Sequence, residues 1–215
     1  MRFLIFGDIH GNLPALEKLF QIENGEYDQA ICHGDVVNYG PWSNACVDFL
    51  ESEENIIKLS GNHELNYIEK TYKGTNVVAQ TFFDFCFPKF SRFKEIKKYE
   101  ASFRLKNYVV QHTLNESYIF PDTDLSSFIL DENYIIGHSH YQFDRYYKGK
   151  RIINTGSIGQ NRKLINIAEY IMLDETKNLI ELKQFRYNID TVIHQMEEEK
   201  YPIICIEYYK NKMTN

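Results

Sequence analysis

The first third of the chain alternates short apolar runs with amphipathic stretches. The apolar runs cover residues 2–6, 29–33 and 55–59, and each has the length of a buried strand. Between them, residues 13–20 and 43–51 carry apolar side chains at the spacing of a helix that faces a sheet. The pattern therefore predicts strand, loop and helix units at the start of the chain.

Both helices have candidate start signals. Asn12 precedes the first helix, and Pro14 lies in its first turn, where a missing N–H does no harm. Ser43 is a candidate cap of the second helix. Because the loops that follow parallel strands meet at one edge of a sheet, we expect ligands to bind at that edge.

The rest of the chain changes character twice. Residues 67–99 are helical in pattern and rich in aromatic side chains, which indicates a pair of helices beside the expected site. These rings are expected to pack against the sheet, with stacking on a substrate as the alternative. Strand-like runs then follow at 103–105, 108–111, 134–136, 151–154, 169–173 and 179–187. We expect an amphipathic helix at 190–200 and a last strand at 203–209.

This order of elements predicts an α+β fold. Strand and helix units followed mostly by strands favour two packed sheets with helices outside. A chain of 215 residues fits one domain. We therefore expect a single domain over residues 1–215, with the helical, aromatic-rich segment 67–99 beside the site.

Charge and cysteine content narrow the partners and the compartment. With 24 Lys and Arg against 30 Asp and Glu, the net charge of −6 offers no broad attraction for long nucleic acid. The four cysteines are scattered without a CxxC motif, which favours reduced thiols. No secretion signal and no apolar stretch of the ~20 residues needed to span a bilayer are present, so we expect a cytoplasmic protein without membrane contact.

Metal-binding residue types follow several of the predicted strands. They are Asp8, His10, Asp35, Asn62, His63, Glu64, His112, His138 and His140. Most come directly after an apolar run, and several follow a glycine. Oxygen and nitrogen ligands collected along one sheet edge predict a binuclear metal site.

The chemistry of these residues supports two ions. The carboxylate of Asp35 has two oxygens, so it can bridge ions about 3.5–4 Å apart. Asn62 supplies a neutral carbonyl oxygen, and His63 beside it can face a substrate. His138 and His140, one residue apart, can reach two different ions. An isolated Gly-Asp or Asp-x-His pair would only indicate a turn, so the interpretation depends on the whole set.

The motifs D-x-H, G-D, G-N-H-[DE], H and G-H-x-H occur here in the order found in the calcineurin-like metallophosphoesterase superfamily, which this chain resembles over most of its length. More narrowly, it is similar to the small bacterial and archaeal YfcE-like phosphodiesterases. That similarity is carried by Gly7-Asp8-Ile9-His10-Gly11-Asn12, by Tyr39-Gly40-Pro41 and by Asn154-Thr155-Gly156-Ser157-Ile158-Gly159-Gln160.

The resemblance implies a four-layer αββα sandwich and two divalent ions, with Mn, Fe, Ni, Co and Zn as candidates. One ion would be bound by Asp8, His10, Asp35 and His140, and the other by Asp35, Asn62, His112 and His138. A bridging water or hydroxide would attack phosphorus. His63 would stay free of metal and stabilise developing charge or protonate the leaving group, oriented by a neighbouring acid. His112 is the least secure ligand, because Thr113 follows it where relatives have Gly.

Four further residues have two interpretations each. His33, where the superfamily usually has an apolar residue, is either a buried, hydrogen-bonded side chain, which we favour, or an outer group of the site. Asn38 either hydrogen-bonds the substrate or serves turn chemistry. Trp42 either packs, which we favour, or serves the site as a hydrophobic lid or a base-stacking platform. Arg162 either reaches a phosphate oxygen or is a solvated side chain.

These observations predict a metal-dependent phosphoesterase that hydrolyses phosphodiester or phosphomonoester bonds of a small, nucleotide-like substrate. A noncatalytic adaptor with the same fold is the alternative, although this chain keeps His63 and the ligand set. A protein phosphatase or a nuclease of the same superfamily is a further alternative. Relatives are often dimers, and the sequence leaves a homo-oligomer open.

Overall fold

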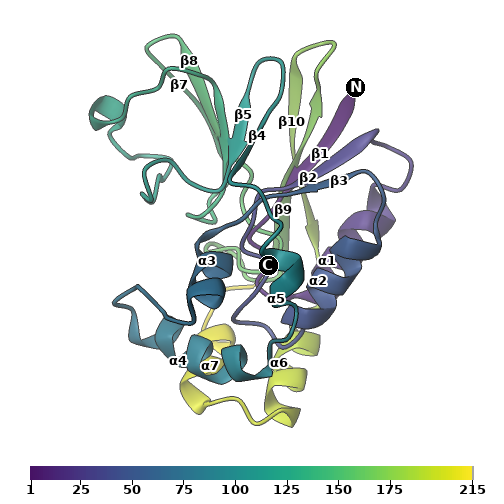
Figure 1. Cartoon of the computed structure of the whole chain (residues 1–215), viewed down its shortest axis with the longest axis vertical. Helices are drawn as coiled ribbons and strands as arrows, with labels where there is room; N and C mark the ends of the chain where they lie inside the picture. Colours follow the sequence, from purple (N-terminus) through teal and green to yellow (C-terminus); the bar gives the residue numbers. More distant parts are fainter. Residues whose placement is uncertain (215) are drawn as a thin grey trace.

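Two five-stranded mixed sheets pack face to face and fill the upper part of the view in Figure 1. The computed structural model describes residues 1–214. The first sheet has the order β10-β9-β1-β2-β3, with β1 Arg2–Phe6, β2 Gln29–Cys32, β3 Ile56–Lys58, β9 Ile167–Asp174 and β10 Leu179–Arg186. β1, β2 and β3 are parallel, and β9 and β10 are antiparallel neighbours.

The second sheet has the order β4-β5-β6-β8-β7. Its strands are β4 Ser102–Arg104, β5 Val109–Gln111, β6 Tyr134–Ile136, β7 Phe143–Tyr147 and β8 Lys150–Asn154. β5, β6 and β8 run parallel, and β4 and β7 are antiparallel edges. The predicted α+β fold of two mixed sheets flanked by helices is confirmed.

The continuous apolar run of β1 is explained by burial on both faces. Phe3 and Ile5 belong to the core between the two sheets. Leu4 and Phe6 belong to the core between the first sheet and the helices. Successive side chains of a strand point to opposite faces, so a strand between two cores is apolar throughout.

Most helices lie against the first sheet and below the strand ends (Figure 1). They are α1 Leu13–Ile22, α2 Ser43–Ser52, α3 Asn62–Glu69, α4 Val77–Cys86, α5 Phe93–Ile96, α6 Ile189–Glu198 and α7 Ile203–Lys210, with the short 3₁₀ helix η1 Phe87–Lys89. Asn12 caps α1 as predicted, because its Oδ1 accepts from the Ala15 N–H at 3.2 Å. The aromatic rings of α4 and its neighbours pack in the core, as expected.

The outer face of the second sheet has a thinner cover. Ile136 of β6 and Ile152 of β8 pack against Leu114, Ile119 and Leu125. These residues come from the long segment between β5 and β6, which contains only the 3₁₀ helix η2 Leu125–Ser127. On this side the flanking layer is therefore mainly irregular chain.

The last predicted strand, at 203–209, is wrong: the segment forms α7. Cys205 and Tyr209, four residues apart, are buried on one side of the helix, whereas Ile203 and Ile204 are exposed. Pro202 is the N-cap, where its missing N–H leaves no hydrogen bond unmade. The burial of Cys205 and Tyr209 at helical spacing thus outweighed the strand preference of the β-branched pair Ile203 and Ile204.

Three smaller expectations also need correction. Trp42, not Ser43, is the N-cap of α2. The Ser43 hydroxyl instead accepts a hydrogen bond from the Asn38 N–H at 3.0 Å. α3 begins at Asn62, so the Gly-Asn-His-Glu motif opens a helix instead of ending in a loop. β7 was not predicted; it pairs with β8 across a tight turn in which Lys148 and Gly149 both have positive φ.

None of the helices described within residues 1–214 has the length and apolar character needed to cross a bilayer. All four cysteines are buried and free.

Candidate metal centre

The predicted site residues come together where strands of both sheets end. Asp8 follows β1, Asp35 follows β2, and α3 carries its motif directly after β3. From the second sheet, His112 follows β5 and His138 follows β6. The two sheets thus each supply part of one cluster, and these side chains are buried except that of Asn62, which is partly exposed.

Five of the predicted ligands have a left-handed backbone. The φ values are 50° at Asp8, 50° at His10, 55° at Asp35, 68° at His138 and 58° at His140. For residues with a Cβ this conformation costs roughly 1–2 kcal/mol each. Such outliers gather at functional sites, where they turn side chains inward just after a strand.

The first group of metal-type side chains consists of Asp8, His10, Asp35 and His140, whose ligand atoms all lie within 4.8 Å of one another. His140 Nδ1–H donates to the Gln160 carbonyl at 2.8 Å, and His10 Nδ1 lies 3.4 Å from the Val37 carbonyl. With protons on both Nδ1 atoms, the two Nε2 lone pairs face each other at 3.1 Å. Facing lone pairs repel, so this arrangement fits a cation between them.

The second group is Asp35, His112 and His138. His112 Nε2 lies 3.1 Å from Asp35 Oδ2 and 3.1 Å from the side-chain oxygen of Asn62. Asp35 belongs to both groups, which is the position of a bridging carboxylate. The donor set of carboxylate, amide oxygen and imidazole suits first-row divalent ions.

The charges of the cluster also fit cations. Burial opposes ionisation of Asp35, but the neighbouring His112 and His63 hold its pKa well below the usual range. Burial likewise opposes protonation of His112, but the Asp35 carboxylate raises the pKa of this imidazole to about 9. Asp8 Oδ1 is buried without a hydrogen-bond partner among the described residues. A bound metal would give this oxygen a partner.

His63 belongs to neither group. Its Nε2 lies 4.0 Å from Asp35 Oδ2, and its Nδ1 lies 3.1 Å from the side-chain nitrogen of Asn38. The Asn38 oxygen accepts from the Tyr67 hydroxyl at 3.3 Å, which orients the amide so that its NH₂ donates to Nδ1. The proton of a neutral His63 is therefore on Nε2, toward the cluster. The expected orienting acid is replaced by Asn38, which is fully buried behind His63.

Glu64 holds the ligand loops together, a role that the sequence analysis did not assign. Its carboxylate accepts from the N–H groups of Gly61, Asp35 and Val36 at 2.8 Å each, and from that of Val37 at 3.2 Å. These four bonds join the loop after β2 to the first turn of α3. Glu64 therefore fixes Asp35 and His63 relative to each other.

Asn154 and Ser157 hold the remaining loops. The Asn154 amide donates to the Gly137 carbonyl at 2.6 Å and to the Ser139 hydroxyl at 3.0 Å. The Ser157 hydroxyl donates to the Asp8 carbonyl at 2.8 Å. The run that starts at Asn154 thus positions ligand loops from both sheets.

His33 is buried and hydrogen-bonded, as the structural interpretation predicted. Its Nε2 lies 2.6 Å from the Thr155 hydroxyl. A Cβ at Gly7 or Gly137 would lie only 2.3 Å or 2.1 Å from the His33 ring. Two strand ends therefore close on this imidazole, and any side chain at either glycine would push them apart.

Gln160 links the cluster to α7. Its carbonyl accepts from His140, as described above, while its side-chain nitrogen donates to the Tyr209 hydroxyl at 2.9 Å. Its side-chain oxygen accepts from the Tyr208 hydroxyl at 3.3 Å. One residue therefore contacts both a predicted ligand and two consecutive side chains of α7.

Two further side chains form the outer wall of the site. The Tyr118 ring stacks on the His138 imidazole, with centroids 3.9 Å apart. The Arg162 guanidinium lies 5.4 Å from the Tyr118 ring. Both line a small hollow over the metal-type residues, together with Tyr39. Tyr118 had no signal in the sequence, because it belongs to no motif and lies in an irregular segment. Trp42 does not line this hollow.

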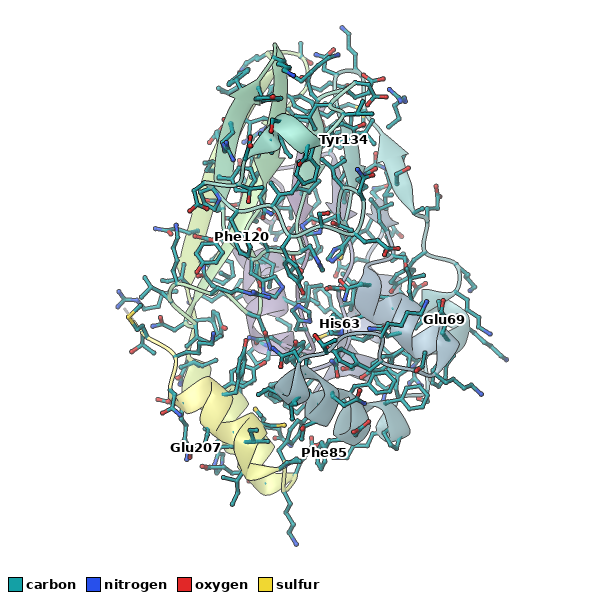
Figure 2. The ribbon with its side chains drawn as sticks, turned by 90° about the vertical axis from the view of Figure 1, so that its left-hand side faces the viewer. His63, Glu69, Phe85, Phe120, Tyr134 and Glu207 are labelled. Carbon is teal, nitrogen blue, oxygen red and sulfur yellow. The ribbon has the colours of Figure 1, made fainter. Side chains whose placement is uncertain are left out.

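A larger cavity of about 330 Å³ continues outward from the cluster. His63 lies on its wall with Tyr72, Tyr118 and Arg162. Figure 2 faces this side of the molecule and shows His63 between the second sheet above and the helices that carry Phe85 and Glu207 below. The cluster is therefore open to a ligand from this side.

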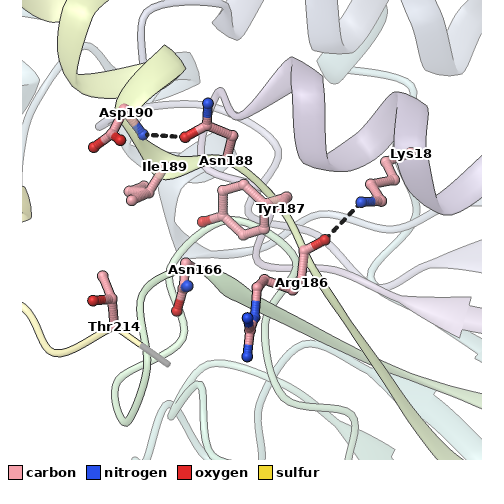
Figure 3. A pocket seen from close by; sticks show the side chains of 8 residues that line it. All are labelled: Lys18, Asn166, Arg186, Tyr187, Asn188, Ile189, Asp190 and Thr214. Atoms are coloured by element: carbon pink, nitrogen blue, oxygen red, sulfur yellow. Dashed lines mark hydrogen bonds between the residues drawn. The ribbon is translucent and has the colours of Figure 1, made fainter.

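Another hollow, of about 550 Å³, lies at the start of α6 (Figure 3). There Lys18 Nζ donates to the Arg186 carbonyl at 2.7 Å, and the Asn188 side chain accepts from the Asp190 N–H at 3.0 Å. None of the predicted ligands lines it. This hollow is larger than the cavity beside the cluster, but it has no group of metal-binding side chains among its described residues.

The sequence profile of the family described as Calcineurin-like phosphoesterase matches residues 1–195. The chain belongs to this family. The resemblance drawn from the motifs is thus confirmed, and a hydrolase with a metal-binding cluster of Asp and His residues is supported.

Known proteins resemble this phosphoesterase over nearly its whole length. The curated protein "Uncharacterized protein MJ0912" from Methanocaldococcus jannaschii is 26% identical over 234 residues, covering 92% of this chain and 93% of its own. A metallophosphoesterase structure from Sphaerobacter thermophilus has a TM-score of 0.78 at 21% identity, covering 98% of each chain. Hypothetical protein PH1004 from Pyrococcus horikoshii OT3 has a TM-score of 0.80 at 16% identity, covering 97% of each chain. At these identities the two structures establish the fold, and the substrate has to be inferred from the site.

Proposed function

We propose that this phosphoesterase hydrolyses a small, nucleotide-like phosphodiester or phosphomonoester with two divalent ions held by the cluster. The observation that carries the proposal is the pair of facing Nε2 atoms of His10 and His140, 3.1 Å apart beside Asp35, which is shared with a second group. This geometry suits two neighbouring cations.

The ligands would follow the two groups. One ion would be held by Asp8, His10, Asp35 and His140, and the other by Asp35, Asn62, His112 and His138. Such ions polarise phosphoryl oxygens and lower the pKa of bound water. Asp35 would contribute to both ion sites, and Glu64 holds the ligand loops in place through its backbone hydrogen bonds.

His63 is the proposed hydrogen-bond donor to the reacting phosphate. Asn38 occupies its Nδ1, so the Nε2–H is directed toward the place where a phosphoryl group would lie, close to Asp35. Burial lowers the pKa of His63, so the neutral imidazole is the dominant form at neutral pH. A neutral Nε2–H can donate a hydrogen bond to the negative charge that develops on the phosphoryl group and the leaving oxygen.

The proposed substrate size follows from the cavity of about 330 Å³ beside the cluster. This volume lies at the lower end of the range for small-molecule sites. Tyr72 and Tyr118 supply ring faces on which a base could stack, and Arg162 supplies a planar cation for phosphate oxygens. For Asn38, which is buried and hydrogen-bonded to His63, we propose an orienting role instead of a direct substrate contact.

Turnover of two chromogenic esters by chelator-stripped protein tests this function. Bis-p-nitrophenyl phosphate and p-nitrophenyl phosphate are each offered with Mn, Fe, Ni, Co or Zn restored in turn, and bound metal is counted. Asp35→Asn is expected to lose more than about 100-fold in metal affinity or activity, because even outer partners of ligands contribute 10- to 100-fold. His63→Ala should keep its metals and lose about 100-fold or more in kcat.

Two matched variants control for general damage. Asp84→Asn removes an exposed carboxylate that accepts from Gln80, and His194→Ala removes an imidazole that is 72% exposed. Both should behave as the parent protein. Two bound metals without turnover of either ester would contradict the enzyme and favour the noncatalytic adaptor.

A further inference from the structure

A separate hollow of about 230 Å³ adjoins the active site on the other side of Arg162. Its polar wall consists of Tyr39, Asn76, Arg162, Tyr208 and Lys212. Tyr39 and Arg162 also line the small hollow over the metal-type residues. A molecule bound to the cluster could therefore extend into this second hollow past these two shared side chains.

The second hollow is cationic. No carboxylate lines it, and neither Arg162 nor Lys212 forms an ion pair within residues 1–214. Lys212 lies over the Tyr208 ring at 4.6 Å. Burial and the nearby Arg162 charge lower the pKa of Lys212. A bound anion would offset the repulsion between these two unpaired cations, which stand out in a chain of net charge −6.

The position of Lys212 is fixed by contacts on both sides. Its N–H donates to the Tyr209 carbonyl at 3.2 Å, which ends α7. The next residue, Met213, accepts from the Ile165 N–H at 2.9 Å, which ties the tail to the loop that carries Arg162. The two cations thus come from segments held together by a backbone hydrogen bond.

We propose that this Arg162–Lys212 hollow binds a second phosphate group of the substrate, so that the enzyme acts on phosphoesters that carry two phosphate groups. The inference rests on the proposed function. Arg offers a planar fork of donors to phosphate oxygens, and Lys adds a point charge. Tyr208 and Asn76 supply further hydrogen-bonding groups. The scissile ester would lie at the cluster while the second phosphate selects the substrate.

Matched chromogenic esters provide the test. The p-nitrophenyl ester of thymidine 5′-phosphate carries one phosphate, and two analogues carry a second one. In the first analogue, the second phosphate is attached to the 3′ oxygen of the sugar. The second analogue is the p-nitrophenyl ester of thymidine 5′-diphosphate, with the ester on the terminal phosphate. The value of kcat/KM for each ester is measured on the metal-loaded protein at low and high salt. The two analogues show whether the second phosphate lies across the sugar or in a polyphosphate chain.

Lys212→Gln and Lys212→Glu are the informative variants. We expect at least one two-phosphate ester to be preferred by the parent protein about tenfold, mostly through KM, and the preference to weaken with salt. Lys212→Gln should remove most of that preference, and Lys212→Glu should reverse it. Lys210→Gln, which removes a neighbouring cation paired with Glu197, should keep it.

The outcomes separate the two proposals. Hydrolysis of all three esters with the same ratios in the parent and in both Lys212 variants would overturn the second phosphate site while leaving the proposed function in place. Equal loss on all esters in the variants would also overturn it, because Lys212 would then not read the second phosphate. If the metal-loaded parent hydrolysed none of the three esters but turned over bis-p-nitrophenyl phosphate, only this inference would fail. Without turnover of any of these esters, the proposed function would fail as well.

Discussion

The inner and outer halves of the site are built differently. The inner half, the metal cluster, comes from short motifs at strand ends, and each ligand is fixed by a loop of a few residues. The outer half, formed by Tyr118, Arg162 and Lys212, comes from an irregular segment, a loop and the end of α7. In the proposed function, the inner half determines which bond is broken and the outer half determines which molecule is held. The outer half is set by contacts between residues far apart in the sequence.

The largest effect is expected where the inner half is held together. Glu64→Gln places an NH₂ group among four backbone donors, so buried polar groups lose their partners. We expect about 1–3 kcal/mol lower stability and 10- to 100-fold weaker metal binding. Chemical denaturation and metal titration measure the two effects. Glu69→Gln, at the exposed end of α3, is the control. Unchanged metal affinity would show that Glu64 is not needed to fix Asp35.

A somewhat smaller effect is expected at Asn38. Asn38→Ala removes the donor to His63 Nδ1, so the imidazole can adopt the other tautomer. We expect kcat to fall about 10- to 100-fold, with two metals still bound. The pH profile of kcat should change as well, which a packing defect alone would not produce. Tyr67→Phe removes only the bond that orients the amide and should have a weaker effect of the same kind.

Tyr118→Ala tests whether the outer half is independent of the inner one. Its ring covers His138 and is half exposed, so truncation should raise KM about tenfold through lost stacking, worth 1–3 kcal/mol per base. Metal content should stay the same. Loss of metal in this variant would mean that the wall also holds His138, and the two halves would not be separable. Tyr146→Ala, on the exposed edge strand β7, is the control.

The smallest effect concerns Glu169, which lies beneath the loop that carries Arg162. Burial raises the pKa of this carboxyl group, and its Oε2 has no partner among residues 1–214. An ionised Glu169 therefore destabilises the fold above its folded pKa, and this cost disappears as pH falls to the unfolded value of 4.5. Glu169→Gln should stabilise the protein by up to about 1 kcal/mol at neutral pH. It should change nothing near pH 4, as thermal melts at both pH values would show.

The same division explains what could be predicted from the sequence. β1, β2, β3 and the helices between them follow from apolar runs and caps, because those signals are local. The metal-type residues were found because each follows such a run. α7 was mistaken for a strand, since its burial comes from distant partners such as Gln160. β7 was missed because its edge position leaves only weak alternation.

Within the site, residue types were easier to predict than their contacts. The sequence indicated that His63 faces the reaction, but Asn38 as its orienting partner depends on a loop with positive φ at Asn38. Glu64 was visible as part of a motif, yet its four backbone bonds exist only in three dimensions. Lys212 had no signal, because nothing local relates the end of α7 to the cluster.

The contacts of Gln160 have a consequence for the dynamics of the protein. Because this residue contacts His140 on one side and the hydroxyls of Tyr208 and Tyr209 on the other, we expect local unfolding of α7 and ion binding at the proposed metal centre to be thermodynamically linked. Ions that hold His140 in place should slow amide hydrogen exchange in α7. By reciprocity, an event that loosens the C-terminal helix would weaken metal binding, although α7 contributes no ligand.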